Sequence, residues 1–226
     1  MQLHSCIFYF KRFMKLYWVK TYRIIKKFFT GFVWSMPKTG SKTVYLTFDD
    51  GPVPQATPWV LEVLKQHNIK ATFFCIGDNI EKHPDTFKQV INDGHTIGNH
   101  TFNHLNGWNT DYEAYIANFI QCERTIQSRH GSTVKVFRPP YGKIKTAQAK
   151  EVRKMGYKII MWDVLSADFD QTITPQQCLA NVINNVADGS IIIFHDSIKA
   201  SVNLRYALPQ AIAHLKERGF SFGVLT

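Results

Sequence analysis

The feature that most constrains the fold is an alternation of short apolar segments with longer amphipathic ones, which begins near residue 44. The short segments are rich in β-branched and aromatic residues and are predicted to be strands, at 44–48, 71–76, 95–99, 136–138, 158–162, 190–194 and 221–225. The segments between them have helical spacing, at 57–67, 85–93, 111–127, 146–155, 175–185 and 205–218. Strands separated by helices predict a parallel sheet that is buried on both faces.

Five of the predicted strands lead to a residue with a carboxyl, imidazole or guanidinium side chain: Asp49, His100, Arg138, Asp163 and His195. Functional side chains collected at the C-terminal ends of parallel strands are typical of a (β/α) barrel. About 180 residues are too few for eight full units. We therefore expect an α/β fold with a distorted, incomplete barrel of about seven parallel strands, and an active site at the C-terminal ends of the strands.

The first of these strands leads into two adjacent acids, Asp49 and Asp50, followed by Gly51 and Pro52. Two neighbouring carboxylates repel each other unless a cation or an arginine compensates their charge. This pair therefore predicts a metal ion, an arginine or both.

Two histidines, His100 and His104, offer imidazoles at positions i and i+4. We expect them on one helical turn, where this spacing places both side chains on the same face. Two histidines and one carboxylate leave a coordination position open on a metal, as in catalytic sites. The spacing alone is weak support in a chain with nine histidines, and it gains weight from the acidic pair.

Two further motifs complete the pattern. The run 138–142 (RPPYG) combines an arginine with two prolines and a glycine, which predicts a rigid loop that can approach a ligand closely. Arg138 can pair bidentately with a carboxylate and keep it ionised. The apolar run 191–194 delivers His195, which can donate a proton near neutral pH.

These motifs, in this order and spacing, resemble those of the polysaccharide deacetylases of carbohydrate esterase family 4, which share the NodB homology domain. The resemblance extends from about residue 44 to about residue 225. It implies metal-dependent hydrolysis of N-acetyl groups on amino sugars of a cell-wall-type polysaccharide or oligosaccharide, peptidoglycan or chitin-like, with release of acetate. It also implies that Asp49 is the catalytic base and that Asp50, His100 and His104 are the metal ligands.

The resemblance assigns the remaining roles as well. Arg138 would orient the base, and the backbone N–H of Tyr141 would contribute to the oxyanion site. His195 would be the general acid, paired with an acid of the fourth motif. Asp168 matches that acid best, and Asp163 is the alternative.

The fourth motif departs from the usual family pattern. The chain has Leu165 where many relatives have an acid, and Phe169 where they have a tryptophan. The second change is expected to alter the wall of the sugar site.

The N-terminal 42 residues form a basic, aromatic arm before a catalytic domain at 43–226. Nine of the 27 basic residues and none of the 17 acidic ones precede Asp49, so nearly all of the net charge of +10 lies in the arm. We expect the arm to pack on or near the barrel. Peripheral contact with an anionic membrane and a processed targeting segment are the alternatives. The arm has no apolar run of the roughly 20 residues that span a bilayer, and no module that recognises nucleic acid.

The expected cofactor is a divalent metal ion, with zinc as the default for two histidines and an aspartate, and with cobalt, nickel or manganese as alternatives. The expected partner is an N-acetylated glycan, bound by a monomer. Two other functions remain open: a hydrolase of small amides or cyclic imides in the same superfamily, and an inactive carbohydrate-binding module. The compartment stays open, because the substrate class points to the cell envelope whereas the arm has no clear export signal.

Overall fold

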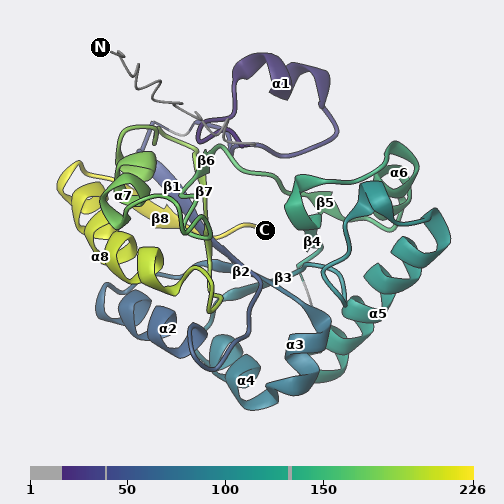
Figure 1. Ribbon diagram of the computed structural model, residues 1–226. Coiled ribbons are helices and arrows are strands. Elements are labelled where there is room, and N and C mark those ends of the chain that lie inside the picture. Colours follow the sequence, from purple (N-terminus) through teal and green to yellow (C-terminus); the bar gives the residue numbers. More distant parts are fainter. Residues whose placement is uncertain (1–16, 39, 132–133) are drawn as a thin grey trace, which may run out of the picture.

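A single curled sheet forms the centre of the molecule, with helices packed around its outer face (Figure 1). The computed structural model describes residues 17–38, 40–131 and 134–226. Seven strands run in the order β5-β4-β3-β2-β1-β7-β6, β8 pairs with β1, and every pair of strands is parallel. The strands are β1 (Thr43–Asp49), β2 (Thr72–Cys75), β3 (Thr96–Asn99), β4 (Val136–Phe137), β5 (Lys158–Ile159), β6 (Val164–Leu165), β7 (Ile191–His195) and β8 (Ser221–Gly223). The prediction of an α/β fold built on an incomplete, distorted barrel is confirmed.

The helices follow the strands along the chain, as the alternating pattern predicts. They are α1 (Arg23–Phe28), α2 (Thr57–Gln66), α3 (Gly77–Lys82), α4 (Pro84–Asn92), α5 (Tyr112–His130), α6 (Thr146–Lys154), α7 (Pro175–Ile183) and α8 (Ser201–Glu217). Local chemistry fixes several helix starts. In α7, for example, the Thr174 hydroxyl accepts a hydrogen bond from the Gln177 N–H, and the Gln177 side chain caps Thr174 in return.

The core lies between the sheet and its helices, and β1 at the centre of the sheet organises it. Successive side chains of a strand point to opposite faces. Phe48 stacks between Phe73 of β2 and Phe194 of β7, with ring centroids 5.0 and 6.2 Å apart. Its neighbours Thr47 and Asp49 therefore lie on the opposite, inner face of the sheet, where they meet the buried Arg138. This alternation places one of the predicted catalytic acids inside the barrel.

The N-terminal segment lies across the gap between the two edge strands, β6 and β5. The N–H of Leu165 donates to the carbonyl of Val19 (2.8 Å), and the N–H of Val33 donates to the carbonyl of Ile159 (2.8 Å). These hydrogen bonds satisfy backbone groups that an open sheet would leave unpaired. Within the described part of the chain, no helix is both long enough and apolar enough to cross a bilayer. Predictions that concern residues 1–16 lie outside the described residues.

Among the α-helices and strands, three were not predicted from the sequence. α1 and α3 have only six residues each, too few to show a helical repeat. The predicted strand 158–162 ends at Ile159, and the chain then turns before it forms the two-residue strand β6.

Candidate metal and catalytic site

The C-terminal ends of four strands bring the predicted site residues together. Asp49 is the last residue of β1 and Asp50 follows it; His100 follows β3, Arg138 follows β4, and His195 is the last residue of β7. The register of the sheet aligns these ends, because Asp49 is the direct neighbour of His195 in the pairing of β1 with β7. The site thus follows from the sheet topology.

Asp50, His100 and His104 form a cluster that fits a metal ion. The Nε2 atom of His104 lies 3.2 Å from Oδ1 of Asp50, and the Nε2 atom of His100 lies 3.8 Å from the same oxygen. One donor atom from each residue lies within 4.8 Å of the others. A carboxylate and two imidazoles suit a divalent ion such as zinc and leave a coordination position open.

The surroundings of His100 and Asp50 put these two donors in the state that a metal requires. The Nδ1–H of His100 donates to the backbone carbonyl of Arg138 (2.7 Å). A carbonyl can only accept, so the hydrogen sits on Nδ1 and the lone pair of Nε2 stays available. Burial lowers the pKa of His100 to about 4, which keeps the imidazole neutral at pH 7. Burial by itself would raise the pKa of Asp50, but the hydrogen bond with His104 and the charges of His195 and His100 hold it well below the usual value.

The prediction of a helical turn for the two histidines is wrong. His100 and His104 lie on an irregular loop after β3, in which Thr101 and His104 have φ angles of 64° and 55°. Hydrogen bonds from the Thr101 N–H to Asn99 (2.8 Å) and from the Phe102 N–H to Asn118 (2.9 Å) hold this loop. The imidazoles still converge, with ring centroids 5.0 Å apart.

Asp49 lies between the metal cluster and a fully buried arginine. Its Oδ1 accepts a hydrogen bond from Nη1 of Arg138 (2.7 Å), and its Oδ2 lies 3.9 Å from Nε2 of His100. Arg138 also donates to the Thr47 hydroxyl (2.8 Å) and to the Met161 carbonyl (3.0 Å). The guanidinium is thus fixed in place, and it leaves one oxygen of Asp49 facing the cluster.

His195 pairs with Asp168. The Nδ1–H of His195 donates to Oδ1 of Asp168 (2.7 Å), and the backbone N–H of His195 donates to Oδ2 (2.7 Å). Burial would lower the pKa of His195, but the charge and hydrogen bond of Asp168, with the charges of Asp50 and Asp49, raise it to about 9. Phe169, at the position where many relatives have a tryptophan, packs edge-on against the imidazole at 5.1 Å.

Asp163, the alternative partner, has other contacts. Its carboxylate forms ion pairs with Lys20 and Lys26 of the N-terminal segment, the second at 2.6 Å, and accepts a hydrogen bond from Ser190. The acid beside His195 is therefore Asp168, and Asp163 instead binds the N-terminal segment to the sheet.

Tyr141 contacts the metal cluster through its side chain. Its hydroxyl lies 3.1 Å from Nδ1 of His104, and the two rings lie 4.6 Å apart. The residue has φ 59° and ψ 8°, a left-handed conformation that the Arg-Pro-Pro-Tyr-Gly loop imposes. Sequence reasoning pointed to the backbone of Tyr141 and did not predict its contact with His104.

Asp196 was also not predicted as part of the site. It is fully buried, and it accepts hydrogen bonds from the Gly51 N–H (3.1 Å) and the Thr57 hydroxyl (2.6 Å). Burial raises the pKa of Asp196 to about 8. A Cβ at Gly51 would lie 2.0 Å from Oδ2 of Asp196, so only glycine fits at this turn. The signal available in the sequence was the position of Asp196 directly after His195.

Backbone strain gathers in the loops of this site. Five of the seven non-glycine residues with positive φ among the described residues lie there: Asp50, Thr101, His104, Tyr141 and Ala167. Each such conformation costs about 1–3 kcal/mol and persists only where the surroundings enforce it. Strain clustered in this way is typical of functional sites.

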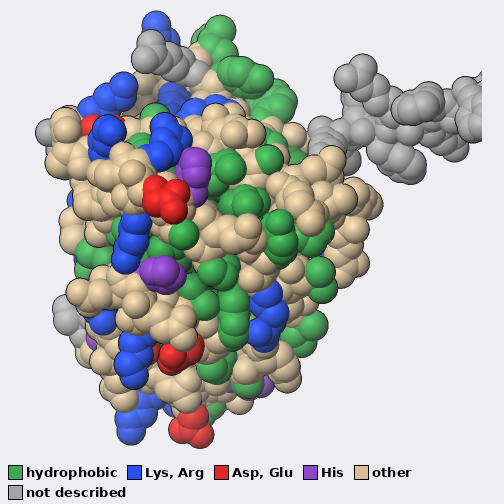
Figure 2. Space-filling model, turned by 90° about the vertical axis from the view of Figure 1, so that its left-hand side faces the viewer, with side chains coloured by type: hydrophobic (Ala, Val, Ile, Leu, Met, Phe, Trp, Pro, Cys, Tyr) green, Lys and Arg blue, Asp and Glu red, His purple; other side chains and the backbone are tan. Residues whose placement is uncertain are grey.

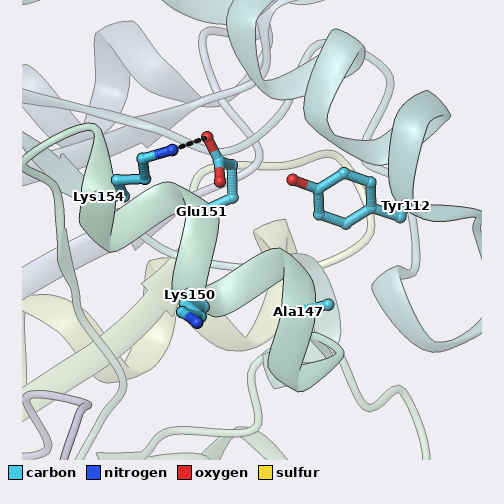
Figure 3. Close-up of a pocket in the computed structure, with 5 residues that line it drawn as sticks. All are labelled: Tyr112, Ala147, Lys150, Glu151 and Lys154. Carbon is cyan, nitrogen blue, oxygen red and sulfur yellow. Dashed lines mark ion pairs between the residues drawn. The ribbon is translucent and has the colours of Figure 1, made fainter.

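A separate cavity of about 550 Å³ lies between the start of α5 and the helix α6 (Figure 3). It is lined by Tyr112, Ala147, Lys150, Glu151 and Lys154, with Glu151 and Lys154 paired at 4.0 Å. It shares no residue with the cluster of acids and histidines, so the two are distinct features.

Comparison with known proteins identifies the family. The model of the polysaccharide deacetylase family matches residues 37–160. The chain is 38% identical to a peptidoglycan-N-acetylglucosamine deacetylase of Bacillus cereus over 80% of its own length and 66% of that protein. It is 37% identical to chitin deacetylase 2 of Saccharomyces cerevisiae over 74% of its own length and 54% of that protein.

A solved structure agrees. The Bc1960 peptidoglycan N-acetylglucosamine deacetylase, crystallised with a naphthyl N-hydroxybenzamide, superposes with a TM-score of 0.82 at 36% identity, over 86% of this chain and 91% of that one. With the fold, the motifs and the clustered residues in agreement, the chain belongs to the polysaccharide deacetylases of carbohydrate esterase family 4.

Proposed function

We propose that the protein hydrolyses N-acetyl groups from amino sugars of a cell-wall-type polysaccharide, peptidoglycan or chitin-like, and releases acetate. The observation that carries the proposal is the position of Asp49, which lies between Arg138 and the cluster of Asp50, His100 and His104. A module that only binds sugar needs no such set of acid, base and metal donors. The relatives named above include a peptidoglycan-N-acetylglucosamine deacetylase and a chitin deacetylase, so the choice between the two polymers stays open.

Asp50, His100 and His104 would hold the metal ion, and zinc is the default for this donor set. A bound divalent ion would supply Lewis acidity, which polarises a carbonyl oxygen and lowers the pKa of water. The contact of Tyr141 with His104 and that of the Arg138 carbonyl with His100 would orient the two imidazoles for this purpose.

Asp49 would act as general base and accept the proton of the water that attacks the acetamide carbon. Arg138 binds one oxygen of this carboxylate and leaves the second oxygen directed toward the cluster. The backbone N–H of Tyr141 would stabilise the negative charge that develops on the acetamide oxygen, in a loop whose left-handed backbone is already fixed.

His195 would act as general acid. The amine is a poor leaving group unless it is protonated, and the raised pKa of His195 keeps its imidazole charged at neutral pH. The Nδ1–H of His195 is hydrogen-bonded to Asp168, so Nε2 of His195 is the nitrogen that can donate the proton. Because one chain supplies all of these groups, a monomer would suffice.

Acetate release from a panel of defined N-acetylated glycans, with chelator and after metal is added back, tests the proposal. Release that is lost with chelator and restored by metal is the expected result. Release that is insensitive to chelator would overturn the metal assignment. The absence of release from every glycan would favour the hydrolase of small amides or imides, which a parallel assay with such compounds detects.

A further inference from the structure

The outer surface of the N-terminal segment carries an unusual group of exposed apolar side chains. We call this group the aromatic patch; it consists of Trp18, Tyr22, Ile24, Phe28 and Phe29. Their exposed fractions are 61%, 61%, 63%, 79% and 51%. Figure 2 shows hydrophobic side chains that protrude next to Lys and Arg side chains at the top of the molecule, where Figure 1 places α1.

The segment that carries the patch is firmly attached to the barrel by its inner side. Lys20 and Lys26 pair with the buried Asp163, and the Thr21 hydroxyl donates to the Trp162 carbonyl (2.8 Å). The backbone hydrogen bonds to the edge strands hold both ends of the segment. The patch is therefore presented outward on a fixed support.

Two pairs of side chains within the patch lie together. Ile24 and Phe28 are separated by four residues and share one face of the helix. Trp18 and Tyr22 contact each other edge-on at 6.2 Å. Lys27 is exposed on the same short helix.

Charge and side-chain type together specify the partner. Nine basic residues and no acidic residue precede Asp49 in the sequence. Lys20 and Lys26 are paired with Asp163, whereas Lys27 is exposed beside the patch and can attract anions. A soluble anionic polymer would need only the charge. Exposed Trp, Tyr, Phe and Ile beside lysine instead suit the interface of an anionic bilayer, where aromatic rings insert at the level of the headgroups.

We propose that the aromatic patch docks the enzyme on the surface of an anionic lipid membrane, lying in the interface without crossing it. The patch projects from the gap between β5 and β6, on the side of the molecule opposite α3 and α4 (Figure 1). It shares no residue with the candidate site. This inference does not depend on the proposed function.

Co-sedimentation of the full chain with vesicles tests the proposal. Vesicles of phosphatidylcholine with about one quarter phosphatidylglycerol should bind the protein, and binding should weaken as salt is raised. Phe28→Ser should reduce the partition coefficient about tenfold, because it removes a large apolar side chain from the interface. Ile24→Ser should act in the same direction.

Val202→Ser is the matched control, since Val202 is 75% exposed on α8, away from the patch. It should bind vesicles as the unchanged protein does, and all variants should retain the same unfolding transition. Three results would overturn the proposal: equal binding to pure phosphatidylcholine, vesicle binding that Phe28→Ser leaves unchanged, or a patch that instead mediates a concentration-dependent dimer lost in Phe28→Ser.

Discussion

At the residue scale, two adjacent aspartates have separate environments because successive residues leave the strand in different directions. Asp49 ends β1 and faces inward to Arg138, whereas Asp50 has a φ of 81° and turns toward the histidines. The carbonyl of Asp50 accepts a hydrogen bond from Asn79 (2.7 Å), and Asp196 holds the next residue, Gly51. These contacts keep the two negative charges apart. Asp49 pairs with Arg138, and Asp50 faces the two histidines of the candidate metal site.

This separation predicts the effect of Asp49→Asn. The amide cannot accept the proton of water, so acetate release should fall by about 100- to 10,000-fold. Metal affinity, measured by titration calorimetry, should stay close to that of the unchanged protein because Asp50, His100 and His104 are intact. Arg138→Lys is a useful companion, since it keeps the charge but loses the forked geometry. Unchanged turnover in Asp49→Asn would exclude Asp49 as the base.

The pair of His195 and Asp168 predicts a shift in the pH profile. Asp168 raises the pKa of His195, and a general acid must be protonated, so activity should decline as the pH rises past that value of about 9. Asp168→Asn removes the charge that favours the protonated form. The alkaline limb of kcat/KM should then move down by about one pH unit or more. If the alkaline limb of the pH profile does not shift in Asp168→Asn, Asp168 has no part in the proton transfer.

The sequence predicted the site residues that can be recognised from their type and their order along the chain. It did not reach Asp196 or the hydroxyl of Tyr141, because each acts through a contact with a residue far away in the chain. Asp196 meets Thr57, which lies 139 positions earlier, and only the fold brings the two together.

At the scale of elements, the buried carboxylate of Asp163 links the N-terminal segment to the edge of the sheet. Asp163 has side-chain exposure of 5%, and both lysines that it binds belong to the segment. Burial would raise the pKa of Asp163, but hydrogen bonds from Lys20, Lys26 and Ser190 lower it. These contacts explain why residues at 17–37 follow the sheet edges.

Asp163→Asn should therefore destabilise the protein. We expect the free energy of unfolding near pH 7 to fall by about 1–3 kcal/mol, measured by denaturant titration. A depressed carboxyl pKa stabilises the fold above the unfolded-state pKa, and this contribution disappears as the pH falls through the lower, folded-state pKa. The difference between Asp163→Asn and the unchanged protein should accordingly shrink in acid.

Asp78→Asn provides the control for this comparison. Asp78 pairs with Lys82 on the surface, where the two side chains are 33% and 61% exposed. Such exposed pairs contribute about 0–1 kcal/mol. Equal losses in the two variants would show that Asp163 has no special part in holding the segment.

The elements that the sequence predicts well are those with enough residues to show a period. β1, β7, α2 and α5 were expected close to their observed bounds. β6 has two residues and α1 has six, and both depend on contacts between the segment and the sheet edges. The His100 loop was expected to be helical because the i, i+4 spacing fits a helix, whereas hydrogen bonds to Asn99 and Asn118 fix another conformation.

At the scale of the whole molecule, the parallel register creates the site. Every strand end that carries a functional residue points to the same rim, so residues as distant as Asp49 and His195 become neighbours. The sequence predicts this convergence because alternating strands and helices leave few other topologies. The sequence does not reveal how the open side of the sheet is covered. That depends on which lysines of the N-terminal segment form ion pairs with Asp163.

The most direct test of the account is a zinc titration of metal-free protein, followed by acetate release from an N-acetylglucosamine oligomer and from peptidoglycan. The unchanged protein should regain activity and saturate near one ion per chain, whereas His104→Ala should need far more zinc or stay inactive. Full activity without metal, or recovery in His104→Ala identical to that of the unchanged protein, would contradict the assignment of Asp50, His100 and His104 as the metal site.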